Sequence, residues 1–437
     1  MIQRSLTIFL VLISGIQWTY AQPKSKGYAM LGSITKRDAR IWYHENGVRR
    51  ANISYWLSDE PSNRHQASIS LDSAFGYCGT FELGLLSPGK KYEFSINDQF
   101  KGNFTTQSLW EWRTDPPTLH VAFGSCAYIN DAEYDRPGKS YGGDDQIFNS
   151  IAEKNPDAMI WLGDNVYFRE GDWDTQSGMV NRYLQSREFG ALQKLWTACP
   201  HYAIWDDHDF GPNDSNGSFV HKNTSLAVFE HFWCNPTSGI ENSKGICSMT
   251  RIADVDFFFL DNRYHRTAAK YNSTPYLSVP HGSQILDEGQ REWLINSLLT
   301  STASFQVICI GGQFLNSEQV FENFANSAEE RTYLLHQFNQ TGKKILFLTG
   351  DRHFGEISLY NENAIPIYDI TSSPLTSSPG NVKDEKNKYR VLGTEVNQRH
   401  FAMLHVTGPR TNRSVSVSFH DTSGKIIHEY TLNYEKK

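Results

Sequence analysis

Residues 158–167 read AMIWLGDNVY, an apolar run that ends in an aspartate and, three residues later, a tyrosine. A short apolar run bounded by turn residues predicts a buried strand, here Ala158 to Leu162. Asp164 then follows the strand end, where its carboxylate can bridge two cations, and Tyr167 can return to the same place if the chain makes one turn. A phenolate oxygen suits a hard trivalent ion, because its negative charge offsets that of the metal. The simpler alternative is a turn aspartate followed by an ordinary packed tyrosine.

Three other apolar runs end in similar chemistry. HVAFGSC ends at Cys126, YAIWDDHD contains Asp207 and His208, and ILFLTGDRH contains Asp351 and ends at His353. Residues just past the ends of buried strands collect on one rim of a sheet. We therefore expect carboxylates, imidazoles, a phenol and a thiol to converge on a shared ion.

The stretch WDDHD, residues 205–209, places three carboxylates around one histidine. Because like charges repel, this clustering predicts a cation among them; an acidic solvated loop is the alternative. Asp207 is a candidate metal ligand, and His208 can present a proton to a leaving group. Asp209 can hold that imidazole in the right tautomer.

The remaining two motifs carry weaker signals. In an extended chain Asp351 and His353 would share one face, so both are predicted to bind one metal, with a surface Asp-His pair as the alternative. Cys126 alone is typical of a buried hydrophobic side chain, as most free cysteines are. Only the other three motifs make Cys126 a ligand candidate.

The run LDNRYHR, residues 260–266, follows another apolar segment. Its Arg263 and Arg266 could bind a substrate phosphate through paired hydrogen bonds. A structural Asp-Arg pair explains the same pattern equally well. The chain has no Walker loop, no G-x-G-x-x-G and no G-x-S-x-G elbow, so nothing in it supports a nucleotide-binding fold or a serine hydrolase.

The pattern differs on the two sides of a linker near residues 110–117. From 22 to 110, short alternating segments such as ARIWYHE and KYEFSIN predict a small β-sandwich. Within it, Leu86, Pro88 and Tyr92 resemble the turn and inward tyrosine in the late strands of fibronectin type III-like modules.

From 117 to 437 strands and helices alternate, which predicts a mixed α/β domain. Apolar spacing predicts a helix after Asp144, and buried strands are expected at 256–260, 305–310 and 344–348. Another helix is expected to start at Ser327, with Glu330 completing a capping box.

The first 21 residues carry Arg4, an apolar stretch over 6–16 and a small-residue site at their end. This pattern predicts a secretory signal peptide, with a buried N-terminal helix as the alternative. No second long apolar run follows, so the mature chain is expected to be exported to the periplasm or the outside, without a membrane span. Six cysteines permit disulfides there, and Cys234 and Cys247 are the first pair to test.

Composition narrows the choice of partner. The chain of 437 residues has 41 Lys and Arg against 48 Asp and Glu, a net charge of −7 at pH 7. Nucleic-acid binding usually shows as a basic patch, so nucleic acid is not expected as the main partner.

Six motifs run through most of residues 120–360, in the order GSC, GDNVY, WDDHD, LDNRYHR, EGQREWL and GDRHFGEI. With these motifs the chain resembles the PhoD-like (alkaline phosphatase D) phosphatases of the metallophosphatase superfamily. The resemblance implies a four-layer α/β fold of two mixed sheets flanked by helices, with strand-end loops that hold iron (Fe³⁺) and calcium (Ca²⁺). Two positions depart from the family pattern. Arg352 stands where a small or apolar residue is common, and Asp209 replaces the more frequent glutamate.

The resemblance also implies roles for single residues. Ligands on the iron side are Cys126, Asp164 and Tyr167, with Asp164 bridging. Further ligands, to either ion, are Asp207, Asp351 and His353. His208 is the catalytic histidine and Asp209 its acidic partner, while Arg263 stays a candidate for the substrate phosphate.

The activity expected is hydrolysis of a small phosphate ester, monoester or diester, outside the cytoplasm. A metal-bound hydroxide would attack phosphorus in line, and His208 would protonate the leaving group. A non-catalytic exported calcium-binding adhesion protein is the alternative from another class, but it would have no use for a proton donor beside its ions. A zinc peptidase is disfavoured because H-E-x-x-H is absent.

Overall fold

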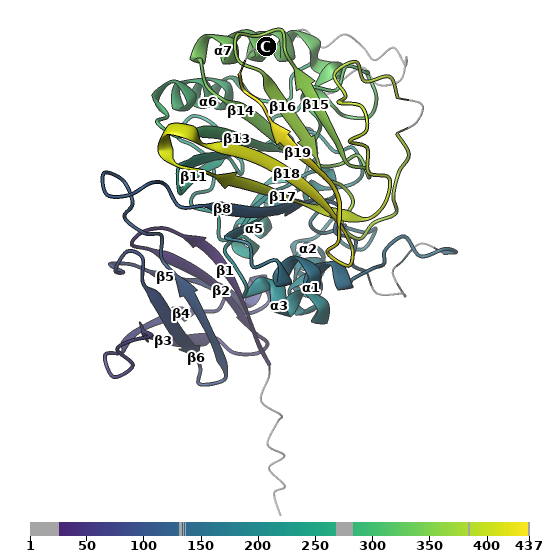
Figure 1. Ribbon diagram of the computed structural model, residues 1–437. Coiled ribbons are helices and arrows are strands. Elements are labelled where there is room, and N and C mark those ends of the chain that lie inside the picture. The colour runs from purple at the N-terminus through teal and green to yellow at the C-terminus, as the bar shows by residue number, and fades with distance from the viewer. Residues whose placement is uncertain are drawn as a thin grey trace, which may run out of the picture.

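The structure, a computed structural model, describes residues 26–130, 133, 135, 137–267, 283–382 and 385–435. The predicted signal peptide, residues 1–21, lies outside the described residues. The chain forms an N-terminal β-sandwich, followed by a larger unit in which two sheets are stacked with helices outside them (Figure 1).

The sandwich consists of two antiparallel sheets, which confirms the prediction. The three-stranded sheet has the order β1 (Gly27–Ile34), β2 (Ala39–Glu45), β5 (Cys78–Leu83), and the four-stranded sheet the order β4 (His65–Ser70), β3 (Arg50–Leu57), β6 (Lys91–Ile96), β7 (Phe100–Thr105). Tyr92 is inward as expected, and its hydroxyl accepts a hydrogen bond from the backbone N of Ser87 at 2.8 Å. That bond fastens the turn at Pro88 to the sandwich core.

The first mixed sheet of the larger unit joins segments that are far apart in sequence. Its strand order is β10 (His201–Ile204), β9 (Ala158–Leu162), β8 (Leu119–Gly124), β17 (His400–Thr407), β18 (Ser414–Asp421), β19 (Ile426–Leu432). Strands β8, β9 and β10 are parallel, and β17, β18 and β19 continue the sheet in antiparallel fashion. The carboxyl ends of β8, β9 and β10 therefore meet on one edge.

The second mixed sheet packs against the first. Its strand order is β11 (Ser248–Ile252), β12 (Val255–Phe259), β13 (Phe305–Ile310), β14 (Ile345–Thr349), β16 (Ile367–Thr371), β15 (Glu356–Tyr360). The four central strands are parallel and the two edge strands antiparallel. The strands expected at 256–260, 305–310 and 344–348 are confirmed to within one residue.

Helices cover the outer face of the second sheet and part of the outer face of the first, which gives the four layers expected (Figure 1). Buried residues of α6 and α7 pack on the second sheet, and the apolar face of α1, with Ile147, Phe148 and Ile151, packs on the first. The helices are α1 (Gln146–Glu153), α2 (Gln176–Glu188), α3 (Gln193–Trp196), α4 (Asp207–Phe210), α5 (Lys222–Phe232), α6 (Glu288–Thr300) and α7 (Ala328–Thr341). None of the helices within the described ranges combines the length and the apolar character that a membrane crossing requires.

One local prediction is wrong, and the cysteine pair named as the first to test is not formed. Helix α7 begins after Ser327, but no side chain caps it, because Glu330 instead accepts hydrogen bonds from the backbone N of Ile285 and Leu286, at 2.6 and 3.0 Å. The pair Cys234 and Cys247 is not bonded, and all six cysteines are free and buried. The Cys247 thiol donates to Gln290 Oε1 at 2.6 Å, and the Cys234 thiol lies 3.2 Å from Thr80 Oγ1.

The sandwich has a hydrophobic core of its own, and three of its buried residues extend the core of the larger unit. Met30, Trp42 and Cys78 of the sandwich belong to the same buried cluster as the first mixed sheet. At this boundary the Arg187 guanidinium is 1% exposed and lies 4.2 Å from the ring centroid of Trp233. Its Nη2 donates to the carbonyl of Phe232 at 2.7 Å, and burial lowers the Arg187 pKa to about 10. The two units therefore pack as one body.

Candidate metal centre

The predicted ligands all lie at strand ends on one rim. Cys126 follows β8, Asp164 and Tyr167 follow β9, Asp207 and His208 open α4 after β10, and Asp351 and His353 follow β14. Cys126, Asp164, Asp351 and His353 all have positive φ, at 60, 52, 68 and 56°. A positive φ in a non-glycine residue costs roughly 1–2 kcal/mol. Such strain gathers at functional sites, where the surrounding fold holds it in place.

Two groups of donor atoms share the Asp164 carboxylate. In the first group Cys126, Asp164 and His353 have donor atoms within 4.8 Å of one another, and in the second Asp164 lies equally close to Asp207 and His208. Asp164 Oδ2 accepts from the Cys126 thiol at 3.4 Å and from the Tyr167 hydroxyl at 3.2 Å. This is the arrangement that a carboxylate between two cations requires.

Asp164, Asp206 and Asp351 are short of positive charge, whereas His208 and Arg263 outweigh burial and lower the pKa of Asp207. Burial, followed by the charges of neighbouring groups, raises the pKa of Asp164 well above its usual range and that of Asp351 to about 7. Asp206 Oδ2 and Asp351 Oδ2 are buried without a hydrogen-bond partner. Burial likewise raises the pKa of the Cys126 thiol to about 12. Because a bound cation would reverse these shifts, the donor set fits metal ions.

The His208 ring stands at the edge of the two groups. It packs against the Tyr167 ring with centroids 4.3 Å apart, and its Nε2 lies 4.0 Å from Asp207 Oδ2. Burial lowers the pKa of His208, while the Asp207 carboxylate works in the opposite direction. With 14% of its side chain exposed, the ring can still reach a bound molecule.

Comparison with known proteins agrees with this geometry. Residues 121–409, more than half of the chain, match the PhoD-like phosphatase family. The chain belongs to the PhoD-like phosphatases. Its fold is similar to the structure of PhoD, with a TM-score of 0.73 and 15% identity over 94% of this chain and 92% of that chain.

A second solved structure shows the same fold. Purple acid phosphatase PPD1 from seeds of yellow lupin (Lupinus luteus) has a TM-score of 0.66 and 10% identity over 93% of this chain and 74% of that chain. No curated protein matches the chain by sequence. The two structural likenesses establish the fold, and the family match makes the chain a phosphoesterase-type hydrolase.

In this PhoD-like chain Asp209 was expected to bind the His208 ring, but its carboxylate binds backbone groups instead. Its Oδ1 accepts from the backbone N of Asn165 and Val166, at 3.0 and 3.2 Å, and its Oδ2 accepts from the backbone N of Asp206 at 3.1 Å. The side chain is fully buried, and burial raises its pKa to about 8. Asp209 therefore ties α4 to the loop that carries Asp164 and Tyr167. The spacing of Asp206 and Asp209 is that of a capping box, a signal present in the sequence.

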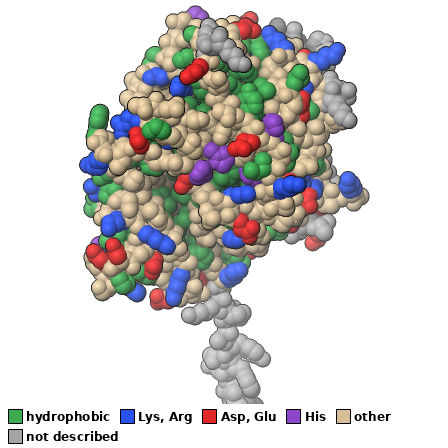
Figure 2. Space-filling view, in the orientation of Figure 1, with side chains coloured by type: hydrophobic (Ala, Val, Ile, Leu, Met, Phe, Trp, Pro, Cys, Tyr) green, Lys and Arg blue, Asp and Glu red, His purple; other side chains and the backbone are tan. Residues whose placement is uncertain are grey.

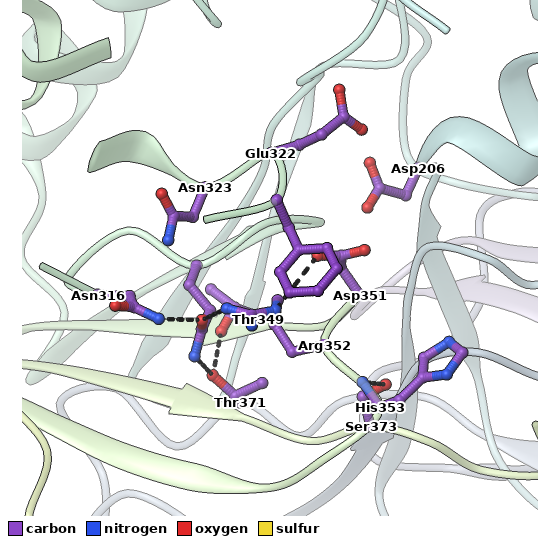
Figure 3. A network of polar contacts seen from close by, with 12 residues as sticks. Asp206, Asn316, Glu322, Asn323, Thr349, Asp351, Arg352, His353, Thr371 and Ser373 are labelled. Carbon is purple, nitrogen blue, oxygen red and sulfur yellow. Dashed lines mark hydrogen bonds and ion pairs between the residues drawn. The ribbon is translucent and has the colours of Figure 1, made fainter. Parts of the chain in front are cut away.

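Asp351 and His353 do not share a face. Asp351 lies among the acidic groups near Asp206, whereas the His353 ring lies 3.3 Å from the Tyr141 hydroxyl and 3.4 Å from Ser377 Oγ. Figure 3 shows the Asp351 carboxylate on the side of Asp206 and the His353 ring apart from it. The prediction assumed an extended chain, but the positive φ of both residues makes the segment turn.

The structure supports the structural alternative for Arg263. Its side chain is 1% exposed, with Nε donating to Asp206 Oδ1 and Nη1 donating to Glu322 Oε2, both at 2.5 Å. A third donor, Nη2, lies 3.7 Å from Asp207 Oδ1. Arg263 thus orients two acidic residues of the rim, Asp206 and Glu322, and its substrate role stays a prediction.

Arg352, the other departure from the family pattern, has its Nε 3.9 Å from the Oδ2 of the predicted ligand Asp351, but its hydrogen bonds go to other residues. Its Nη1 donates to Gln313 Oε1 at 2.7 Å and its Nη2 to Glu385 Oε2 at 2.5 Å, and the guanidinium lies 4.5 Å from the ring centroid of Phe321. It therefore braces the loops around Asp351 without supplying a ligand.

Sequence reasoning missed three residues at this rim. Asp214 and Glu322 have donor atoms within 4.8 Å of one from Asp207, and Tyr141 bonds His353. Glu322 and Tyr141 follow no apolar run. Only the folded chain brings them to the strand ends.

Proposed function

We propose that this chain is an exported, metal-dependent phosphatase that hydrolyses small phosphate esters. The observation that carries the proposal is the pair of donor groups that share Asp164, in a chain of the PhoD-like family. A calcium-binding adhesion protein would need surface ligands. Here Cys126 and Tyr167 are at most 1% exposed, and a histidine stands beside them.

The donor chemistry of the predicted ligands, which add Tyr167 and Asp351 to members of the two groups, suggests the metals. Thiolate, phenolate and carboxylate from Cys126, Tyr167 and Asp164 form an anionic set that suits Fe³⁺. The oxygen atoms of Asp207 and Asp351 suit Ca²⁺, which prefers carboxylates. When bound, such ions offset charge on phosphoryl oxygens and lower the pKa of water toward neutrality.

The chain's own residues supply binding, orientation and the proton. His208 would donate a proton from its ring to the leaving oxygen, because the ring borders the two donor groups and 14% of its side chain stays exposed. The Tyr167 ring limits rotation of the imidazole. Asp209 keeps the loop with Asp164 and Tyr167 in register with α4.

The test is to purify the chain, measure its bound metals and compare hydrolysis of nitrophenyl phosphate with that of bis(nitrophenyl) phosphate. Asp164→Asn should lower kcat/KM by roughly 100-fold or more, the usual effect of removing transition-state charge stabilisation, and should release metal. Asp59→Asn, an exposed change in the sandwich, is the matched control. Full activity in Asp164→Asn would reject the site.

Two further measurements address the finer parts of the proposal. Iron bound by Tyr167 should give a visible charge-transfer band that Tyr167→Phe removes. A colourless, iron-free, active enzyme would reject the iron assignment. Export is tested by sequencing the amino terminus of the protein recovered outside the cytoplasm: a start near residue 22 is expected, and retention of Met1 in the cell would contradict it.

A further inference from the structure

A chain of three histidines lies on the outer face of the first mixed sheet. His120 of β8 and His405 of β17 are paired across the antiparallel strands, with their Nδ1 atoms 2.8 Å apart. His405 Nε2 lies 2.8 Å from Ser418 Oγ, which lies 2.8 Å from His420 Nε2. Figure 2 shows histidine side chains gathered near the middle of the face where β8, β17 and β18 lie in Figure 1.

The direction of each hydrogen bond follows from one backbone carbonyl. His420 Nδ1 lies 3.1 Å from the carbonyl oxygen of Gly424, so Nδ1 carries a proton and Nε2 of the neutral ring accepts. Ser418 must then donate to His420 and accept from His405 Nε2. The lone pair of His405 Nδ1 is thereby directed at His120.

This is the arrangement in which proteins present a histidine to a metal. A ligating imidazole donates its other N–H to a fixed acceptor, which selects the tautomer, and for His405 that acceptor is Ser418. Two nitrogens bound to one ion at about 2.0–2.1 Å lie roughly 3.0–3.4 Å apart. The present separation of 2.8 Å between His120 and His405 needs to open by only a few tenths of an ångström.

The pair is well separated from the catalytic rim. His120 is the second residue of β8, and Cys126 follows the opposite end of that strand. Six residues of extended chain span about 20 Å. The exposed Glu429 of β19, opposite Ser418 in the register, adds negative charge on the same face.

We propose that His120 and His405 bind one divalent transition-metal ion of the class that prefers imidazole, namely Zn²⁺, Ni²⁺ or Cu²⁺. To bind, His120 moves its proton from Nδ1 to Nε2, so that both Nδ1 lone pairs meet the ion. Ser418 and His420 act as positioning residues. The site is independent of the proposed function.

The test uses the full chain, prepared without a histidine tag, and Ni²⁺ as the probe. Calorimetric titration should find one more Ni²⁺ equivalent in the wild type than in His120→Gln or His405→Gln, while phosphatase activity stays unchanged. His336→Gln, an exposed histidine on α7, is the matched control and should keep every equivalent. Ser418→Ala should weaken that Ni²⁺ affinity about 10- to 100-fold, as loss of a partner of a ligating histidine does.

A second measurement is independent of stoichiometry. Bound Cu²⁺ should show electron-paramagnetic-resonance hyperfine structure from two nitrogens in the wild type, reduced in either glutamine variant. Equal numbers of Ni²⁺ equivalents in wild type and both variants would overturn the proposal and leave only a proton shared between the rings. An effect of Ser418→Ala no larger than that of His336→Gln would overturn the positioning role.

Discussion

Gly163, just past the end of β9, lies against Asp206, just past the end of β10, and Gly163→Ala tests whether this close approach builds the metal centre. An added Cβ would lie 2.6 Å from Asp206 Cβ and 2.8 Å from Asp206 N, and Gly163 has φ +88°. Reaching an ordinary carbon contact of about 3.5 Å requires a shift of about 0.9 Å. That shift would move Asp164 relative to Asp207.

The expected magnitudes follow from these two effects. Positive φ costs an alanine roughly 1–2 kcal/mol, and overpacking adds about 1–3 kcal/mol. The free energy of unfolding should therefore fall by about 2–5 kcal/mol. A misplacement near 1 Å lowers the rate by roughly 100-fold, so we expect kcat/KM to fall by that order.

Gly47 offers the matched control. It has φ +75° with nothing within 4 Å of an added Cβ, and it lies in the sandwich between β2 and β3. Gly47→Ala should therefore show the conformational effect alone, with unchanged kcat/KM. The assay combines urea unfolding with hydrolysis of nitrophenyl phosphate and metal content. If Gly163→Ala keeps kcat/KM within threefold of the wild type and loses no more stability than Gly47→Ala, the close approach does not build the site.

Three further predictions concern buried polar groups. Asp209→Asn places an amide N–H₂ against one of the backbone donors that Asp209 now binds. The free energy of unfolding should therefore fall by about 1–3 kcal/mol, and part of the bound metal should be lost. Unchanged metal content would contradict the positioning role of Asp209. His201 accepts from Trp161 Nε1 at 2.9 Å, and burial lowers its pKa to about 3 from 6.5. Because the pKa of His201 is lower in the folded protein than in the unfolded chain, the buried neutral ring contributes to stability above pH 6.5. This contribution is lost as the pH falls toward 3, by up to about 1.4 kcal/mol per pH unit. Between pH 6.5 and 3, the urea midpoint should fall less steeply with pH in His201→Gln than in the wild type. Parallel plots of midpoint against pH would show that His201 is not the group responsible. Arg413 pairs with the buried Asp254 through bonds of 2.9 and 2.6 Å, so Arg413→Met should lower the free energy of unfolding by about 3–5 kcal/mol, and Arg413→Met with Asp254→Leu should recover much of it if the unpaired charge is the cause.

The sequence predicts the framework of this protein well, because short apolar runs between turn residues specify buried strands. Four such runs become β8, β9, β10 and β14, and their ends meet on one rim. The family resemblance rests on the same strand-end motifs and is confirmed.

What sequence reasoning missed depends on backbone dihedral angles and on distant partners. Asp351 and His353 part because both have positive φ, which a two-residue spacing does not reveal. Arg263 could be read as a phosphate ligand until Glu322, 59 positions away, is seen to bind it. Glu330 has the spacing of a capping residue, but a neighbouring segment offers it two backbone donors.

The core that runs from the sandwich into the first mixed sheet limits the modularity of this protein. A catalytic unit expressed from residue 117 would lack Trp42 and Cys78, which are at most 1% exposed in the full chain. Their removal would uncover Phe232, whose ring packs against Trp42, and would hydrate the guanidinium of Arg187, which lies 5.7 Å from the ring centroid of Trp42. The N-terminal sandwich is thus a structural part of the catalytic unit. Its sequence is constrained by the residues that it buries more than 100 positions away.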